Sequence, residues 1–275
     1  MEYFSILPEP VRSIRSKYYV GVLLQRLEIK RVAQIPAALD RLLQISGVNS
    51  FLRYRSDLFR YWNGANIKNP RFVSEINHAL PGTARILNHP VWKLISEPIF
   101  AENDLVRLAQ VLDPGLHGYI IEYNEQDQEI RLKGFSTGNR WMRSDSKFLR
   151  TIDRRGLDEL AALLILTRAQ EIQGSYMTAY RLRELLTDFF VEISHLGEFQ
   201  AVAAQIYRQV YQLFISVYYK SSRSDLGLEF MLKNSRVDLD YTVGVIERIS
   251  SREPSRNDAY SNILRGRRSL SRGGR

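Results

Sequence analysis

The chain of 275 residues contains no cysteine. This absence excludes disulfide bonds, thiolate metal sites and cysteine nucleophiles. Long apolar runs are also missing: the longest, Leu160–Leu166, is far shorter than the roughly 20 residues that a membrane-spanning helix needs. The first ten residues carry Glu2 and Glu9 and no apolar core, so they do not resemble a secretory signal. We therefore expect a cytoplasmic protein with no membrane partner.

The sequence also lacks the motifs of common enzyme classes. It has no GxxxxGK[ST] loop, no GxSxG turn and no HExxH helix, and none of its four histidines is spaced like a metal ligand. Glu28–Lys30 fits half of a nuclease motif, and a loose acidic set surrounds the middle of the chain: Asp104, Asp113, Glu122 and Glu129. Such a set could hold magnesium, so a cryptic metal-dependent nuclease or toxin stays open as an alternative, but a solvated acidic loop is the better explanation of these residues. We expect no catalytic residues, no cofactor and no metal.

The net charge of +9 is concentrated at the two ends of the chain. Residues 1–100 hold 14 basic and 7 acidic side chains, and residues 251–275 hold 7 and 2. The middle, residues 101–250, is slightly acidic, with 18 basic and 21 acidic side chains. A densely negative partner would meet the two basic ends. Simple solubility is the alternative explanation of the charge.

Apolar residues recur at intervals of three and four over most of the chain, which predicts helices. The expected helices cover residues 8–30, 36–47, 50–62, 70–80, 84–87, 91–95, 103–112, 156–172, 182–193, 206–218 and 238–249. Leu160–Leu166 must be buried nearly all round its helix. Residues 118–123 and 129–135 read as two strands of a small β-hairpin, with a helix as the alternative. The expected fold is mainly α, with this possible hairpin near 118–135 and a C-terminal helical bundle.

The same pattern suggests four regions: a helical, helix-turn-helix-like DNA-binding region (1–112), a connecting segment with the possible hairpin (113–150), a helical C-terminal domain (151–250) and a basic flexible tail (251–275). Four tyrosines widen the apolar stripe of the last long helix: Tyr207, Tyr211, Tyr218 and Tyr219. Such a stripe favours a homodimer through the C-terminal helices, or contacts with other protein partners.

The predicted helix over 50–62 divides into two faces. One sector of about 100° holds polar residues, namely Asn49, Arg53, Ser56, Asp57 and Arg60. The opposite side holds Phe51, Leu58, Phe59 and Trp62. A recognition helix needs this division, because one face locks into the core while the other enters the major groove. Arginine reads guanine edges and asparagine reads adenine edges there.

The segment Leu42–Leu80 resembles the Cro/C1-type helix-turn-helix family. The likeness is carried by a turn at Gly47-Val48-Asn49, a helix closing on Trp62, a proline at Pro70 and an apolar helix through Ile76. Leu43 and Arg53 depart from the family pattern. The resemblance implies DNA binding, with Asn49 and Arg53 as base-reading residues. An ordinary amphipathic helix in a helical core is the alternative.

Together these features predict a sequence-specific double-stranded DNA-binding protein, a regulator in a bacterial, phage or plasmid system. The expected DNA-binding residues are Asn49, Arg53, Ser56, Arg60, Lys68, Arg265, Arg267 and Arg268. The main alternative is a non-enzymatic protein–protein interaction component of a multi-protein assembly, such as a defence or mobile-element system.

Overall fold

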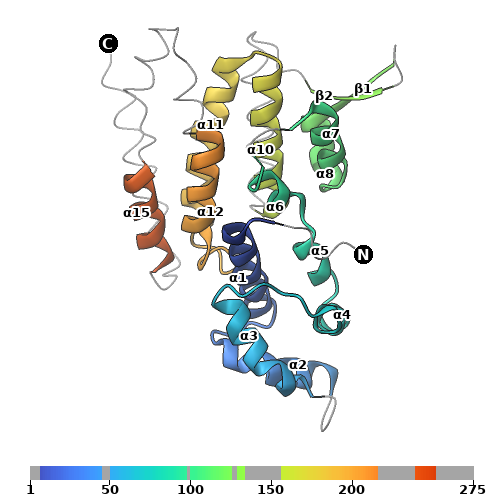
Figure 1. Ribbon diagram of the computed structural model, residues 1–275, viewed down its shortest axis with the longest axis vertical. Coiled ribbons are helices and arrows are strands. Elements are labelled where there is room, and N and C mark those ends of the chain that lie inside the picture. Colours follow the sequence, from blue (N-terminus) through green and yellow to red (C-terminus); the bar gives the residue numbers. More distant parts are fainter. Residues whose placement is uncertain are drawn as a thin grey trace.

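The protein is mainly helical, with one small antiparallel sheet of two strands (Figure 1). This confirms the fold class expected from the sequence. The structure, a computed structural model, describes residues 7–44, 50–97, 100–125, 129–133, 156–215 and 239–251.

The helices and strands fall into two groups along the chain. The first group is α1 (Glu9–Arg26), η1 (Val32–Gln34), α2 (Ile35–Leu43), η3 (Phe51–Tyr54), α3 (Arg55–Trp62), α4 (Pro70–Ala79) and α5 (Thr83–Leu87). The second is α6 (Pro90–Leu94), α7 (Glu102–Gln110), α8 (Pro114–Ile120), β1 (Ile121–Asn124), β2 (Glu129–Leu132), α10 (Leu157–Ile172), α11 (Tyr176–Ile193), α12 (Ala203–Val210), the π-helical η4 (Tyr211–Ile215) and α15 (Leu239–Ser250).

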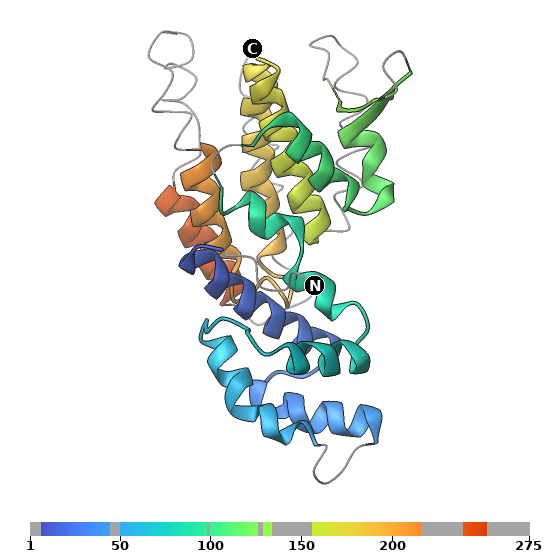
Figure 2. The same ribbon diagram turned by 45° about the vertical axis from the view of Figure 1, so that its right-hand side comes forward.

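Two hydrophobic clusters define two lobes. The small lobe is built on a cluster that ends at Leu87, and the large lobe on a cluster that resumes at Val91. The chain therefore passes from one core to the other between Leu87 and Val91, which is earlier than residue 112, where the sequence suggested a domain boundary. Helix α1 belongs to both lobes, since Tyr18 packs into the large core and the adjacent Tyr19 into the small one. Figure 2 shows α1, in dark blue, between the two groups of helices.

Local sequence signals place the ends of the small-lobe helices. The Asn69 side chain accepts a hydrogen bond from the Phe72 N–H at 3.1 Å, and Pro70 occupies the first turn of α4, as expected for this pair. Gly64, at φ 94°, follows the end of α3, and its missing side chain leaves room for Ser13 of α1. Gly82, at φ 87°, turns the chain between α4 and α5.

The expected single helix over 50–62 is wrong. Its first part is the 3₁₀ segment η3, and only the following eight residues form the α-helix α3. A 3₁₀ turn advances by about 120° per residue instead of about 100°, so side chains before and after it no longer follow one wheel. Tyr54 and Tyr61 are consequently buried at 5% and 4% exposure, whereas Phe59, expected in the core, is 41% exposed.

Helix α10 is the centre of the large lobe. Every residue of its apolar run, Leu160–Leu166, has zero exposure, as the sequence required. Helices α11 and α12 run antiparallel, because Phe190 packs on Tyr207 while Arg183, earlier in α11, donates to the carbonyl of Phe214, later in the chain. Tyr207 is fully buried in this packing, so the expectation that it is an exposed contact residue is wrong.

The β-hairpin is confirmed, with Ile121 opposite Leu132 and Tyr123 opposite Ile130. Its first strand starts later than expected, because the residues before it complete helix α8, whose N-terminus Asp113 caps through the Gly115 N–H at 2.7 Å. None of the helices in the described ranges is long and apolar enough to cross a membrane.

Candidate nucleic-acid interface

The outward face of α3 is the most distinctive surface of the small lobe. Leu58 and Tyr61 hold the inner side of the helix in the core, with 1% and 4% exposure. The opposite side presents exposed residues at helical spacing, and these are Arg55, Ser56, Phe59, Arg60 and Asn63. An α-helix with its side chains is about 10–12 Å in diameter and fits the roughly 12 Å wide DNA major groove.

Three cations lie on or beside this face: Arg55, Arg60 and Lys68. Arg60 is 71% exposed on its side chain and pairs with Asp57, one turn earlier, at 3.3 Å between Nη1 and Oδ1. Lys68 is exposed in the segment that leads into α4. Arg55 and Lys68 form no hydrogen bond or ion pair with any of the residues that the structure describes. Their charges are therefore available to a negatively charged partner.

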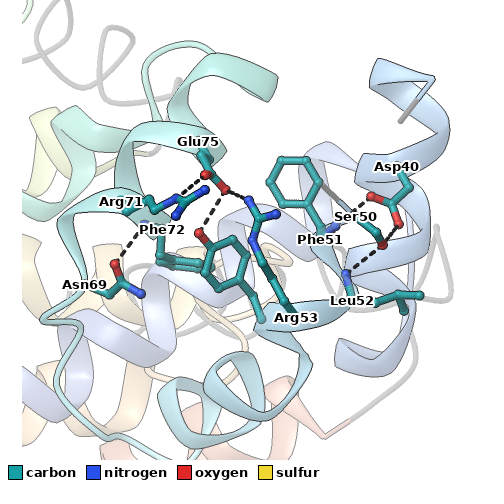
Figure 3. Close-up of polar contacts among 10 residues, drawn as sticks. Asp40, Ser50, Phe51, Leu52, Arg53, Asn69, Arg71, Phe72 and Glu75 are labelled. Carbon is teal, nitrogen blue, oxygen red and sulfur yellow. Dashed lines mark hydrogen bonds and ion pairs between the residues drawn. The ribbon is translucent and has the colours of Figure 1, made fainter. Parts of the chain in front are cut away.

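A polar cluster connects η3 to α4 beside this face (Figure 3). The carboxylate of Glu75 accepts hydrogen bonds from Arg53, from the Tyr54 hydroxyl at 2.9 Å and from Arg71 Nε at 2.8 Å. Burial raises the pKa of Glu75, but the hydrogen bonds from Arg71, Tyr54 and Arg53 outweigh it and leave this pKa below its ordinary value. Hydrogen bonds to Tyr54 and Glu75 in turn raise the pKa of Arg53.

A second acidic anchor fixes the start of η3. Asp40 of α2 accepts hydrogen bonds from the Ser50 hydroxyl at 2.5 Å and from the Phe51 N–H at 2.7 Å, and Ser50 itself caps the 3₁₀ turn (Figure 3). Both acids, Asp40 and Glu75, therefore stabilise the packing of the small lobe. They hold η3, and with it the first turn of α3, against α2 and α4.

The electrostatic consequence is a surface with an excess of available positive charge. Residues 1–100 carry twice as many basic as acidic side chains. Three of the acids in this part, Asp40, Asp57 and Glu75, are occupied by neighbouring groups of the same lobe. The cations at or beside α3 that remain exposed are Arg55, Arg60, Lys68 and Arg71.

The structure brings four of the residues expected to bind DNA to this part of the lobe. Ser56 and Arg60 lie on α3 and Lys68 lies before α4, all exposed. Arg53 lies in η3, outside α3, and its guanidinium already forms an ion pair with Glu75 of α4. The remaining four, Asn49, Arg265, Arg267 and Arg268, lie outside the described residues. Eleven residues separate α2 from α3, whereas the connection of a helix-turn-helix is three or four residues long.

Sequence reasoning missed two buried arginine sites. Arg15 of α1 is 1% exposed and donates to the Leu87 carbonyl at 3.2 Å and to Asn66 Oδ1 at 3.1 Å. Burial, with Arg12 nearby, lowers the pKa of Arg15 to about 10. In the large lobe, Arg168 and Arg183 share Glu171 and donate to carbonyls of η4. Each of these arginines interrupts an apolar helical pattern, and this interruption was the only feature of the sequence that could have indicated a buried arginine.

One histidine, His89, is paired with an aspartate as in a catalytic dyad, but neither of its ring nitrogens is free to accept a proton. His89 is 6% exposed and its Nε2 lies 3.2 Å from Asp158 Oδ1. Its other ring nitrogen, Nδ1, accepts the Val91 N–H at the start of α6, at 3.2 Å. The proton therefore resides on Nε2, and no ring nitrogen is left to act as a base toward a substrate. His89 joins α6 to α10 and caps α6.

Within the described ranges, no three His, Asp or Glu side chains are grouped so that they could hold a metal ion, and the acidic set around the hairpin is not brought together there. Comparisons with protein-family models, with curated proteins and with solved structures each returned no match.

Proposed function

We propose that the protein binds double-stranded DNA through the outward face of α3, with the flanking cations Lys68 and Arg71 contacting phosphates. In this proposal Ser56 and Arg60 are the residues nearest the base edges, since they lie one turn apart on the exposed side of the helix. The protein acts in the cytoplasm as a regulator of a bacterial, phage or plasmid system, as the sequence suggested.

The observation that supports the proposal most is that acidic side chains around α3 are paired within the described part of the small lobe, whereas some of its basic side chains are not. Asp40 and Glu75 accept hydrogen bonds that hold η3 against α2 and α4, whereas Arg55 and Lys68 are exposed without a partner among the described residues. An α-helix that presents arginine beside such cations has the size and charge of a groove-binding element. Arg53 contributes less than the sequence suggested, because Glu75 already binds it.

A titration of fluorescent duplex DNA with the full-length protein, at a series of salt concentrations, tests the proposal. Each phosphate that the protein neutralises contributes about −0.9 to the slope of log K against log salt. Four cations near α3 predict a slope of about −3 or steeper. A specific target would then be sought by selection from random duplexes. No binding at low salt, or binding that is independent of salt, would contradict the proposal.

A second candidate is a protein-interaction surface on the same lobe. Leu42 and Leu52 are 52% and 56% exposed and lie on α2 and η3, which pack together, and Phe59 is 41% exposed on α3. Large exposed apolar side chains on adjoining elements are typical of protein contacts. Replacing Leu42 and Leu52 by serine leaves DNA affinity unchanged if α3 alone binds the duplex, and abolishes partner capture if these residues form a protein interface.

The homodimer and the basic tail remain part of the proposal. With Tyr207 buried, a dimer through the C-terminal helices requires other exposed residues of the large lobe. The arginines of residues 264–275 would add electrostatic affinity by contacting phosphates or the minor groove. Truncation before Leu264 is therefore expected to weaken binding to every duplex equally.

A further inference from the structure

A cleft of about 260 Å³ lies where α1, the small lobe and the large lobe meet. Its walls come from α1, from the turn and helix around Gly82 and α5, from the first turn of α10 and from the segment after α11. Ligand sites favour such junctions between structural units. The volume is slightly below the usual range of about 300–1,000 Å³ for ligand pockets, so it suits a molecule smaller than a nucleotide.

Two polar atoms in the walls, the Tyr18 hydroxyl oxygen and Glu198 Oε2, have no hydrogen-bond partner among the described residues. Tyr18 lines the cleft and forms ring contacts with Trp92 and Phe199. Its hydroxyl forms no hydrogen bond with the residues that the structure describes, and it is not one of the fully buried atoms without a partner. The Glu198 carboxylate also lines the cleft, and its Oε2 is buried without a partner. Of the two, Glu198 Oε2 is the atom whose burial calls for a partner, because a buried polar atom without a hydrogen bond costs about 1–3 kcal/mol and such atoms are rare in folded proteins.

The backbone holds Glu198 in this position. A Cβ atom added to Gly21 of α1 would lie 2.9 Å from the Glu198 carbonyl oxygen, so only glycine permits α1 to approach this segment so closely. Burial raises the pKa of Glu198. No cation among the described residues pairs with it, although it lines the same cleft as two arginines.

These two arginines, Arg26 and Arg85, are partly committed. Arg26 donates Nη1 to the Pro81 carbonyl at 2.8 Å, and Arg85 donates Nη2 to the Val111 carbonyl at 2.9 Å and lies 3.8 Å from Asp158. Each guanidinium has five N–H donors, so both retain donors for an anionic group. The cleft thus combines donors for an anion with an acceptor that has no donor.

We propose that this cleft binds a small zwitterion of the size of a free amino acid. The ligand carboxylate lies on Arg26 and Arg85, and the ligand ammonium group donates to Glu198 and to the Tyr18 hydroxyl. The site is separate from the face of α3 and does not depend on the proposed DNA binding. Because the walls belong to both lobes, the ligand also joins them.

Thermal unfolding of the full-length protein with each of the twenty free α-amino acids in turn tests the proposal. At least one is expected to raise Tm by about 2 °C or more at saturating concentration. The amide of that amino acid, which lacks the carboxylate, and its N-acetyl form, which lacks the ammonium group, are expected to give no shift. Inorganic phosphate serves as a simple anion.

Failure of all twenty amino acids to raise Tm would overturn the proposal. An equal shift with the N-acetyl form or with phosphate would also overturn it, since the ammonium contact would then be unnecessary. The variant Glu198→Gln keeps the shape of the side chain and is expected to lose the ligand-induced shift. The control Glu184→Gln, on the exposed side of α11, is expected to keep it, and a Glu198→Gln protein that responds like the wild type contradicts the site.

Discussion

Glu75 is the residue at which stability and DNA binding are expected to respond in opposite directions. It joins η3 to α4 by accepting hydrogen bonds from Arg53, Tyr54 and Arg71. In Glu75→Gln the side chain keeps one acceptor oxygen and loses its charge. The ion pair between Arg71 and Glu75, at i,i+4 on the exposed surface, contributes about 0.3–0.5 kcal/mol after solvent screening. A hydrogen bond to a charged group, such as the Glu75 carboxylate, contributes about 1.5–3 kcal/mol. Because the amide retains part of these bonds, we expect a loss of about 1–2 kcal/mol.

The same change releases Arg53 and Arg71 beside the proposed DNA-binding face and removes one negative charge. Duplex affinity should therefore rise several-fold at low salt, and the slope of log K against log salt should steepen by about one unit. The pKa of Glu75 is lowered in the fold, so its stabilisation is present above the pKa of the unfolded chain and is lost as pH falls through the folded pKa. The difference in stability between wild type and variant should accordingly shrink below about pH 4.

Urea unfolding followed by circular dichroism and fluorescence anisotropy with a labelled duplex measure the two effects. Glu184→Gln is the matched control, because Glu184 also accepts a tyrosine hydroxyl, that of Tyr180 at 3.2 Å, but lies on α11 in the large lobe. The control is expected to leave the salt slope unchanged. A Glu75→Gln protein that binds duplex DNA more weakly than wild type while remaining folded would refute the reasoning.

Three further predictions concern packing and assembly. Replacing glycine by alanine within a helix usually stabilises it by up to about 1 kcal/mol. In Gly21→Ala the new Cβ would lie 2.9 Å from the Glu198 carbonyl oxygen, so we expect a loss of about 1–3 kcal/mol in thermal unfolding. A higher Tm would contradict the close packing. Arg15→Met should lower the free energy of unfolding by about 1–3 kcal/mol, because it leaves the Leu87 carbonyl without its side-chain donor, and an unchanged urea midpoint would be inconsistent with this. Light scattering over a concentration series should show a dimer, and a constant monomer mass at high micromolar concentration would exclude one.

Much of the helical framework was accessible from the sequence, because its signals are local. Asn69-Pro70 started α4 and Gly82 ended the turn after it, as the capping and positive-φ preferences of these residues dictate. Leu160–Leu166 indicated a helix buried on all sides, and α10 is that helix. The hairpin followed from two short apolar segments with a polar run between them.

The faces of the candidate interface were harder to predict, because they depend on tertiary contacts. The helical wheel over 50–62 assumed one regular helix, and the 3₁₀ turn η3 shifted its phase, so Phe59 faces outward and Tyr54 faces inward. The pairing of Arg53 with Glu75 links positions 22 residues apart, which no local pattern records. The burial of Arg15 and the meeting of Tyr18 with Glu198 in one cleft likewise arise only when distant segments pack together.

The central claim, that α3 and its flanking cations bind duplex DNA, is tested most directly by comparing two triple variants. Arg55, Arg60 and Lys68 are replaced by alanine in one protein, and the exposed large-lobe residues Arg107, Arg131 and Arg248 in the other, so both lose three positive charges. Anisotropy titrations across salt should show a slope of log K that is shallower by about two to three units for the first variant only. Equal slopes for both variants would mean that overall charge, and not the face of α3, governs binding, and would contradict the claim.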